Sequence, residues 1–413
     1  MLIKVFSIYN LLRYIFWVTL FVPFLFASNK VTTDILYFFI LLSIFIFFSS
    51  VILARHHLAT ENKKLDFFYI LLITFITASW LYGVSIGLLK GNPVSGVFRN
   101  FFGLLFYSLF FALIYYQIKV VEIVKFLLFA FLIQFFWAVH FTYIRIESLF
   151  HVSILSLSDL RSAYSTAFIL GFPVLTISLS FWYSKTKQFR EFYNLPKHNF
   201  FYISIFLAAS FVVVVPNASK GFVLAFILLF ILFFILVLWK ILATSRANFS
   251  SFILVFVGFL IFFSLWVNFS DIILYSFSSE EASNSVRSEQ SAFILDEVTF
   301  WGAGLGAVLQ SGYTRDATGY GLELTFLSLI HKLGFMSFFL FLSYAIPLLI
   351  ALHSIVTNRN PPVGFLIVGC LLFMVPGAGN PILLSPIAII LHCFALYLSL
   401  IIVKNNTNSL KNL

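Results

Sequence analysis

The fold is decided by long apolar stretches, such as residues 221–243, GFVLAFILLFILFFILVLWKILA. This stretch carries one charged side chain, Lys240, and a helix needs only about 20 such residues to cross a bilayer. The chain of 413 residues is 62% hydrophobic and 10% charged, whereas a soluble domain carries about 25% charged residues. The apolar runs are continuous rather than alternating, which argues against an outer-membrane barrel. The composition therefore predicts a polytopic helical membrane protein.

Twelve apolar runs follow one another along the chain, which predicts an all-α protein with about 12 transmembrane helices. They lie near 9–28, 35–54, 66–89, 100–117, 122–144, 163–184, 199–216, 221–243, 251–269, 321–352, 363–379 and 383–403. We expect residues 1–413 to form a single integral membrane domain, with one long loop, partly helical, at 270–320 between helices 9 and 10. The run at 321–352 is longer than a bilayer needs, and Gly334 could allow a bend in it.

The distribution of charge predicts the orientation of the chain. Loops on the cytoplasmic side carry an excess of lysine and arginine. With the N-terminus inside, that side holds 16 of the 25 basic residues and only 4 of the 15 acidic ones. Both termini are therefore expected in the cytoplasm, with the 270–320 loop outside.

The one long polar interruption lies at 285–334 and collects most of the residues able to do chemistry. Segment 285–300 has room for a short helix capped by Asn284 or Ser285, whose apolar positions would rest against the membrane surface. Most carboxylates here are expected to be solvated. Glu323 differs because it begins an apolar helix, where it is either a favourable helix-end charge or a general base in a partly dry cleft.

Basic residues recur at span ends on the outer side, where the charge rule predicts few. Lys220, Arg161 and Arg287 could together form a rim for a phosphate or diphosphate, although each alone could equally anchor a helix end. His331 could act as an acid or base, or bond a neighbouring helix. No metal-ligand spacing is present, and no basic run favours nucleic acid.

Other motifs point away from nucleotide and disulfide chemistry. Gly302, Gly304 and Gly306 resemble a nucleotide fingerprint only superficially, because no βαβ unit surrounds them. We expect them to allow tight turning or a close backbone approach, and the segment to form a lid over the site. Cys370 and Cys393 lie in apolar runs and are expected to be small buried hydrophobes.

Several short motifs occur in the order known from one family. They are the Ser219-Lys220-Gly221 turn, Arg287 at the opening of a long outer loop, Gly302-Ala303-Gly304-Leu305-Gly306, Glu323, Leu333-Gly334-Phe335 and Gly377-Ala378-Gly379-Asn380-Pro381. With these motifs the chain resembles the O-antigen polymerase and O-antigen ligase superfamily of bacterial inner-membrane proteins. The resemblance covers most of the chain in topology and is sharpest at 217–223 and 285–335.

The resemblance implies lipid-linked glycosyl transfer on the periplasmic face of the inner membrane. The donor would be a glycan on undecaprenyl diphosphate, used without nucleotide sugar, metal or other cofactor. Family members carry arginine where this chain has Lys220, and their loop-opening arginine matches Arg287. Ligases typically have a His-Asn pair where this chain has Leu322-Glu323, which favours a polymerase.

The expected function is polymerisation of undecaprenyl-diphosphate-linked repeat units into an O-antigen or capsule-like polysaccharide. Glu323 would be the general base, with Arg287 as the second catalytic residue. Lys220, Arg161 and Arg287 would hold the diphosphate, with His331 as a further substrate contact. The expected partners are carrier-linked glycans and membrane lipid, and a chain-length regulator is left open.

Two alternatives remain at this point. An O-antigen ligase would transfer the finished polymer to lipid A-core. A transporter or flippase of lipid-linked sugar would show repeated halves and charges at the membrane midplane, whereas the ionisable residues here gather at one face.

Overall fold

The computed structural model describes residues 2–25, 63–149, 166–184, 192–196, 198–216, 219–244, 274–313 and 321–411, and isolated positions between 189 and 272. Arg161, Arg315 and the apolar run at 35–54 lie outside them. The first half contains α1 (Leu2–Leu25), α3 (Lys63–Leu89), α4 (Val94–Arg99), η1 (Phe102–Ser108), α5 (Leu109–Tyr115), α6 (Val120–Leu149), η2 (Thr166–Leu170), α7 (Gly171–Tyr183) and α9 (Asn199–Val214). The second half contains α10 (Lys220–Thr244), α12 (Ala282–Asp296), α13 (Thr325–Leu333), η3 (Gly334–Met336), α14 (Ser337–Val356), α15 (Pro361–Leu371), α16 (Met374–Ala378) and α17 (Pro386–Lys411).

The described part of the chain is helical and contains no strand, which confirms the all-α class. Seven of its helical segments are long and apolar enough to cross a membrane, and three shorter apolar helices accompany them. This supports a membrane-embedded protein. The run at 251–269 lies mostly outside the described residues, so the count of twelve spans stays a prediction.

Two of the expected spans are broken rather than continuous. The run at 100–117 contains η1 and α5, and Phe101, which separates η1 from the preceding α4, has a left-handed φ of 53°. The run at 321–352 is divided into α13 and α14 by η3. The expected bend at Gly334 is confirmed, since this residue ends α13 with a φ of 54°.

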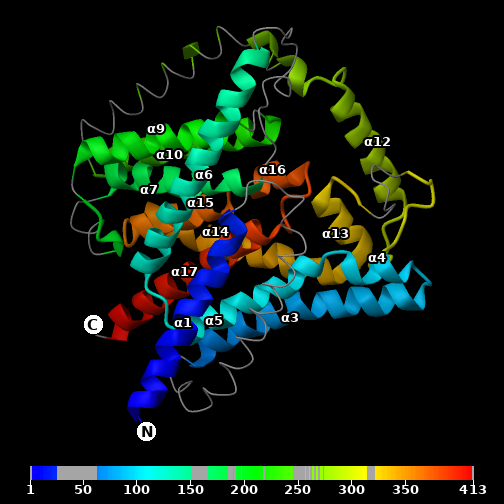
Figure 1. Ribbon diagram of the computed structural model, residues 1–413, viewed down its shortest axis with the longest axis horizontal. Coiled ribbons are helices and arrows are strands. Elements are labelled where there is room, and N and C mark those ends of the chain that lie inside the picture. The colour runs from blue at the N-terminus through cyan, green and yellow to red at the C-terminus, as the bar shows by residue number, and fades with distance from the viewer. Residues whose placement is uncertain are drawn as a thin grey trace.

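The core is built around α15 and α17, which belong to the two most enclosed of the seven long apolar segments. α15 packs against α7, α14 and α17, and α17 also contacts η1 and α5 (Figure 1). Polar side chains inside this core bond to one another. The Tyr107 hydroxyl lies 2.6 Å from His392 Nδ1, His392 Nε2 lies 2.9 Å from the Ser343 carbonyl oxygen, and the imidazole stacks on Tyr344 with a centroid distance of 3.9 Å. This network joins η1, α14 and α17, as buried polar groups require.

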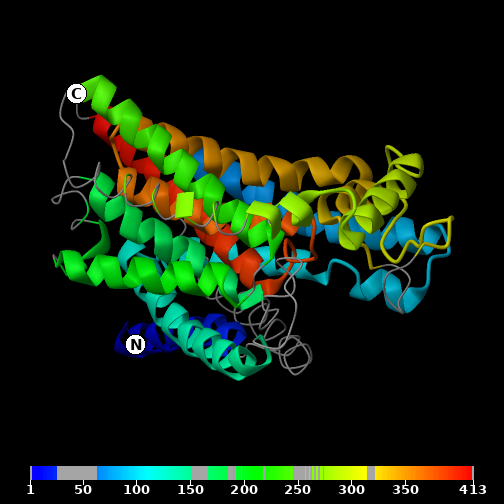
Figure 2. The same ribbon diagram turned by 90° about the horizontal axis from the view of Figure 1, so that it is seen from above.

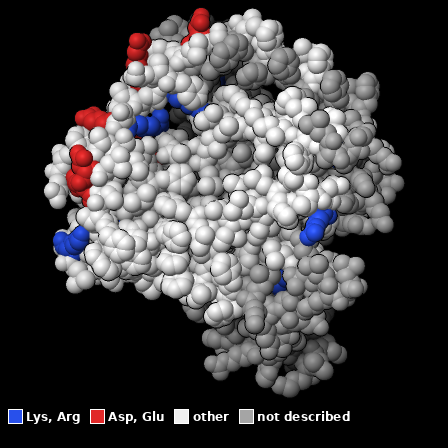
Figure 3. All heavy atoms as spheres, turned by 180° about the vertical axis from the view of Figure 1, so that it is seen from behind, with Lys and Arg blue, Asp and Glu red and all other residues white. Residues whose placement is uncertain are grey.

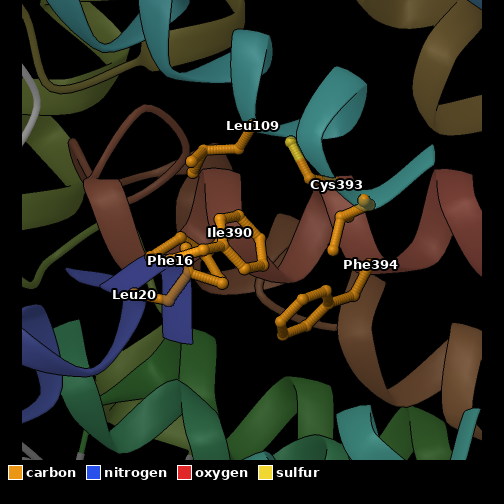
Figure 4. Close-up of a pocket in the computed structure, with 7 residues that line it drawn as sticks. Phe16, Leu20, Leu109, Ile390, Cys393 and Phe394 are labelled. Atoms are coloured by element: carbon orange, nitrogen blue, oxygen red, sulfur yellow. The ribbon is translucent and has the colours of Figure 1, made fainter. Parts of the chain in front are cut away.

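A small apolar crevice lies where α1 and α5 meet α17 (Figure 4). It is too narrow to hold a water molecule and is lined by Phe16, Leu20, Leu109, Leu113, Ile390, Cys393 and Phe394. No charged side chain lines it, so it has the character of a packing gap. Both cysteines, Cys370 and Cys393, are buried and free, as expected.

The two ends of the helix bundle differ in character. The N-terminal end of α1 and the C-terminal end of α17 lie at the end of the bundle opposite α12 (Figures 1 and 2). Near the termini, Arg13 on α1 pairs with Glu122 on α6 at 2.6 Å. α12, α13 and the glycine-rich segment lie at the other end of the bundle. The polar stretch at 285–334 is therefore located there.

Candidate functional site

The helix α12 carries most of the polar side chains at this end of the molecule. It begins three residues earlier than the sequence predicts, because Glu281 rather than Asn284 or Ser285 caps it. The Glu281 carboxylate accepts the Asn284 N–H at 3.2 Å, which satisfies one of the free donors of the first turn.

Three of the four apolar positions of segment 285–300 that are expected at the membrane surface pack against the protein itself, whereas Leu295 is exposed. Ile294 is fully buried with Leu309 and Leu322, and Phe293 and Val298 pack against these three. The loop thus has its own small hydrophobic cluster, because its returning segment supplies apolar partners for α12. This cluster holds α12 in register with the segment that re-enters at Glu323.

Lys220 is the first residue of α10, and α12 supplies its partners. Its ammonium donates to the Glu281 carboxylate and, at 2.9 Å, to Asn284 Oδ1. The Asn284 amide in turn donates to the carbonyl oxygens of Ser276 and Ser278 at 3.1 and 2.6 Å. Only 15% of the Lys220 side chain and 12% of the Glu281 side chain is exposed, so this pair is largely shielded from water.

Arg287 lies on α12 between Asn284 and Gln290 and pairs with Glu323. Its Nε lies 3.3 Å from Glu323 Oε2, and its Nη1 donates to Ser283 Oγ at 2.9 Å. Both side chains of the pair are partly exposed, 24% and 21%, so a ligand can reach them. The two proposed catalytic residues, far apart in the sequence, are therefore in contact.

Gln290 holds the backbone of Glu323 and Leu324 in place. It is 1% exposed, and its Oε1 accepts the N–H groups of both Glu323 and Leu324 at 3.1 Å. This clamp replaces the hydrogen bonds that a chain entering a helix would otherwise take from water. Gln290 thus sets the position of Glu323 relative to α12.

The α16 segment completes the surroundings of the pair. A Cβ on Gly379 would lie 3.6 Å from Arg287 Nε, and Thr325 Oγ1 donates to the Asn380 carbonyl oxygen at 3.0 Å. A Cβ on Gly221, next to Lys220, would meet Pro376 Cα at 2.6 Å, so these backbones touch. The start of α10, α12, the re-entry at Glu323 and the end of α16 therefore meet in one place.

The remaining predicted residues are not in this group. His331 is 1% exposed, and its Nε2 lies 3.8 Å from Glu297 Oε2 at the C-terminal end of α12. Glu297 also accepts the Gln310 N–H at 2.8 Å. His331 is thus placed away from the Arg287–Glu323 pair, and Arg161 lies outside the described residues.

The glycine-rich segment is not the expected lid over the site. It is packed between α3 and α13. Gly302, Gly304 and Gly306 have φ values of 75°, 82° and 74°, which favour glycine. A Cβ on Gly304 would lie 2.3 Å from the Gly87 nitrogen, and one on Gly302 would lie 2.5 Å from the Lys332 carbonyl oxygen. The close approach expected of these glycines is confirmed, with backbone as the neighbour.

Sequence reasoning missed Glu281, Asn284 and Gln290 as members of the site. Gln290 stands three and four residues before Phe293 and Ile294, so it shares their helix face. A glutamine on an apolar stripe is a signal for a buried polar contact. The partners of Lys220 left no comparable signal.

The arrangement can bind an anion and accept a proton. Lys220 bonds to Asn284, which lies one turn before Arg287 on α12, and each of the two cations is opposed by a carboxylate. Figure 3 shows basic side chains at the wall of a hollow at this end of the molecule, with acidic side chains along its outer edge. Among the residues that the structure describes, no three histidine, cysteine, aspartate or glutamate side chains are grouped to hold a metal ion.

Comparison of the chain with protein-family models, with curated proteins and with solved structures finds no match. The function proposed below is therefore based on the geometry of the site and on the motifs it brings together.

The Lys220 contacts make a first prediction about stability. Lys220→Met leaves the shielded Glu281 carboxylate without its cation and should lower the free energy of unfolding by about 1–3 kcal/mol. Lys220→Arg keeps a cation in reach and should cost less. Chemical denaturation in detergent, with Glu281→Gln added to complete a double-mutant cycle, measures the coupling; a coupling near zero would show that the pair contributes nothing.

A second prediction concerns pH. Partial burial acts to raise the pKa of the Glu281 carboxyl, but the hydrogen bond and charge of Lys220 outweigh it, so this pKa lies below its ordinary 4.5. Because the folded-state pKa is the lower one, the pair stabilises the protein fully above pH 4.5, and this is lost as pH falls through the folded-state pKa.

Glu281→Gln should therefore lower the melting temperature at neutral pH, and the difference from wild type should shrink below pH 4.5. Glu280→Gln is the matched control, since this neighbouring carboxylate is exposed. A difference between Glu281→Gln and wild type that stays constant into acid would contradict the assignment.

Proposed function

We propose that the protein polymerises undecaprenyl-diphosphate-linked oligosaccharide repeat units, by glycosyl transfer on the periplasmic face of the bacterial inner membrane. The observation that carries the proposal is the contact between Arg287 and Glu323, with Lys220 beside the same helix. Four of the six motifs in which the chain resembles the O-antigen polymerase and ligase superfamily meet here: Ser219–Gly221, Arg287, Glu323 and Gly379-Asn380.

The reaction needs a base and a stabilised leaving group. Glu323 accepts the proton of a sugar hydroxyl, whose oxygen then attacks the anomeric carbon of the donor glycan. The bond from that carbon to the diphosphate oxygen breaks, and the electron pair leaves with the diphosphate. Arg287 and Lys220 hold the developing charge, arginine through two parallel donors.

The ion pairs imply an order of events. In the ligand-free arrangement Arg287 is opposed by Glu323 and Lys220 by Glu281. A diphosphate carries more charge than one carboxylate, so it competes for both cations and releases Glu323 from its partner. Donor binding thereby frees the base, which limits proton abstraction to the loaded site.

The bundle geometry supports the orientation. α1 begins and α17 ends opposite α12 (Figures 1 and 2), so a chain with both termini in the cytoplasm would carry this site on the periplasmic side. The excess of basic residues in the loops assigned to the cytoplasm points the same way.

Deletion of the gene tests the function through the glycan ladder. A polymerase mutant should leave lipid A-core with at most one repeat unit, whereas loss of a ligase should leave polymer on the carrier and none on the core. Long chains of normal length in the deletion strain would overturn the proposal. Purified protein given lipid-linked repeat units should lengthen them, whereas a flippase would only move them.

A further inference from the structure

Residues 299–307 are fixed between α3 and α13, which belong to the segments Phe67–Leu89 and Thr325–Val356, each long and apolar enough to cross a membrane. On one side the Leu305 N–H donates to the Gly83 carbonyl oxygen of α3 at 2.9 Å. On the other, the N–H groups of Ala303 and Gly304 donate to the carbonyl oxygens of His331 and Lys332 on α13 at 2.6 and 2.9 Å. The depth of this segment is therefore set by the helices themselves.

The glycine-rich segment contacts α3 at Gly83, which lies before the end of the apolar part of that helix. That part runs over Phe67–Leu89, 23 residues, and Lys90 follows it. At ~1.5 Å per residue it is about 34 Å long, close to the ~30 Å of a bilayer's hydrocarbon core. Gly83 lies about 9 Å inside that end by the same rise. Residues 303–305 are thus held at the level of the apolar zone rather than above it.

A non-helical chain at membrane depth must have its backbone N–H and carbonyl groups hydrogen-bonded within the protein. The backbone of this segment meets that requirement. Each N–H and carbonyl from the Trp301 carbonyl to the Leu305 carbonyl has a partner. Three of these bonds are given above. Side chains supply four more: the Tyr82 hydroxyl donates to Trp301 O, the Lys90 ammonium to Gly302 O, and the Asn92 amide to Ala303 O and Leu305 O. Within the segment, the Gly302 N–H donates to Thr299 O and the Ala307 N–H to Gly304 O. A solvated loop has no need of such complete pairing.

Two aromatic side chains of the same segment point outward. Phe300 is 68% and Trp301 61% exposed, and the Phe300 ring stacks on Phe335 at 5.3 Å. Leu89 at the end of α3 and Leu295 on α12 are also exposed. Tryptophan and tyrosine are enriched where a protein crosses the headgroup level of a bilayer. We infer that residues 299–307 are a re-entrant element, with Phe300 and Trp301 inserted among lipids at the boundary of headgroups and acyl chains.

This anchor holds one end of α12 at the membrane. The segment follows directly on α12, whose C-terminal Glu297 is bonded to Gln310. The opposite end of α12 carries Glu281 and Asn284, the partners of Lys220. The inference does not depend on the proposed reaction.

Spin labels in proteoliposomes of phosphatidylethanolamine and phosphatidylglycerol test the depth. In a background with Cys370→Ala and Cys393→Ala, single labels are placed by Phe300→Cys and Trp301→Cys. Ser285→Cys on the exposed side of α12 is the aqueous reference, and Ile231→Cys on the exposed side of α10 is the bilayer reference. Power saturation compares collisions with molecular oxygen and with a water-soluble nickel chelate.

Labels at 300 and 301 should collide with the nickel chelate several-fold less often than the label at 285, and with oxygen nearly as often as the label at 231. Nickel accessibility equal to that at 285 overturns the inference, and so does protection from both reagents, which would show a second copy covering the surface. If the cysteine-free background fails to fold, Trp301→Phe replaces it: quenching by brominated phosphatidylcholine should fall relative to wild type, and unchanged quenching overturns the inference.

Discussion

Glu323→Gln should abolish chain elongation while leaving the amount of folded protein unchanged. The amide has the shape of the carboxylate but cannot take a proton from the acceptor hydroxyl, and loss of a positioned general base costs about 10²–10⁴-fold in rate. The Gln290 clamp binds the backbone N–H of residue 323, so it survives the substitution. In a deletion strain complemented with this variant, the ladder should stop at one repeat unit.

The matched control is Glu289→Gln, which removes an exposed carboxylate from the same end of the molecule. It should restore the full ladder. With purified protein and lipid-linked repeat units, Glu323→Asp should retain part of the elongation rate, because it keeps a base within reach. Normal ladders from Glu323→Gln would remove Glu323 from the reaction.

Arg287→Ala tests the other half of the pair, and its readout separates binding from chemistry. Without the guanidinium, the diphosphate loses its bidentate donor both when bound and when leaving. Elongation should be lost in cells, and in the purified system the substrate concentration needed for half-maximal rate should rise. Arg287→Lys should restore only part of it, because an ammonium lacks the planar fork.

Gly304→Ala should cause the largest loss of stability among single substitutions in the glycine-rich segment. The added Cβ would lie 2.3 Å from the Gly87 nitrogen and 2.5 Å from its Cα, and both neighbours are backbone atoms of α3. The residue also has a φ of 82°, which is strained for alanine. Together the clash and the strain are expected to cost more than about 4 kcal/mol, a loss typical of disrupted close packing.

Gly91→Ala separates strain from clash. Gly91 has a φ of 73°, but no other part of the protein lies within 4 Å of the place that a Cβ would occupy. Its cost should be only the left-handed penalty of about 1–2 kcal/mol. Thermal unfolding in detergent, followed by tryptophan fluorescence, compares the two variants. Equal losses would show that backbone conformation alone requires glycine at 304 and that the contact with α3 is loose.

Local pattern was enough to predict several features of the site. The break at Gly334, the presence of a short helix within segment 285–300 and the close approach at Gly302 and Gly304 all follow from residue type and spacing. The helix cap was placed wrongly, because the Glu281 side chain reaches the Asn284 N–H, a local contact that residue preference alone does not favour. The prediction that the glycine-rich segment forms a lid was also wrong, because the backbone atoms that its glycines contact belong to α3 and α13.

Composition alone determined that the chain is helical and embedded in a membrane. Continuous apolar runs leave the backbone no hydrogen-bond partner in lipid except its own helix, so this conclusion needs no tertiary contact. Only the tertiary structure decided which cation faces which carboxylate: Lys220 meets Glu281 and Arg287 meets Glu323 because α10, α12 and the re-entering chain dock together. Such pairs join residues far apart in the sequence, and the position of one carries no information about its partner until the helices are packed.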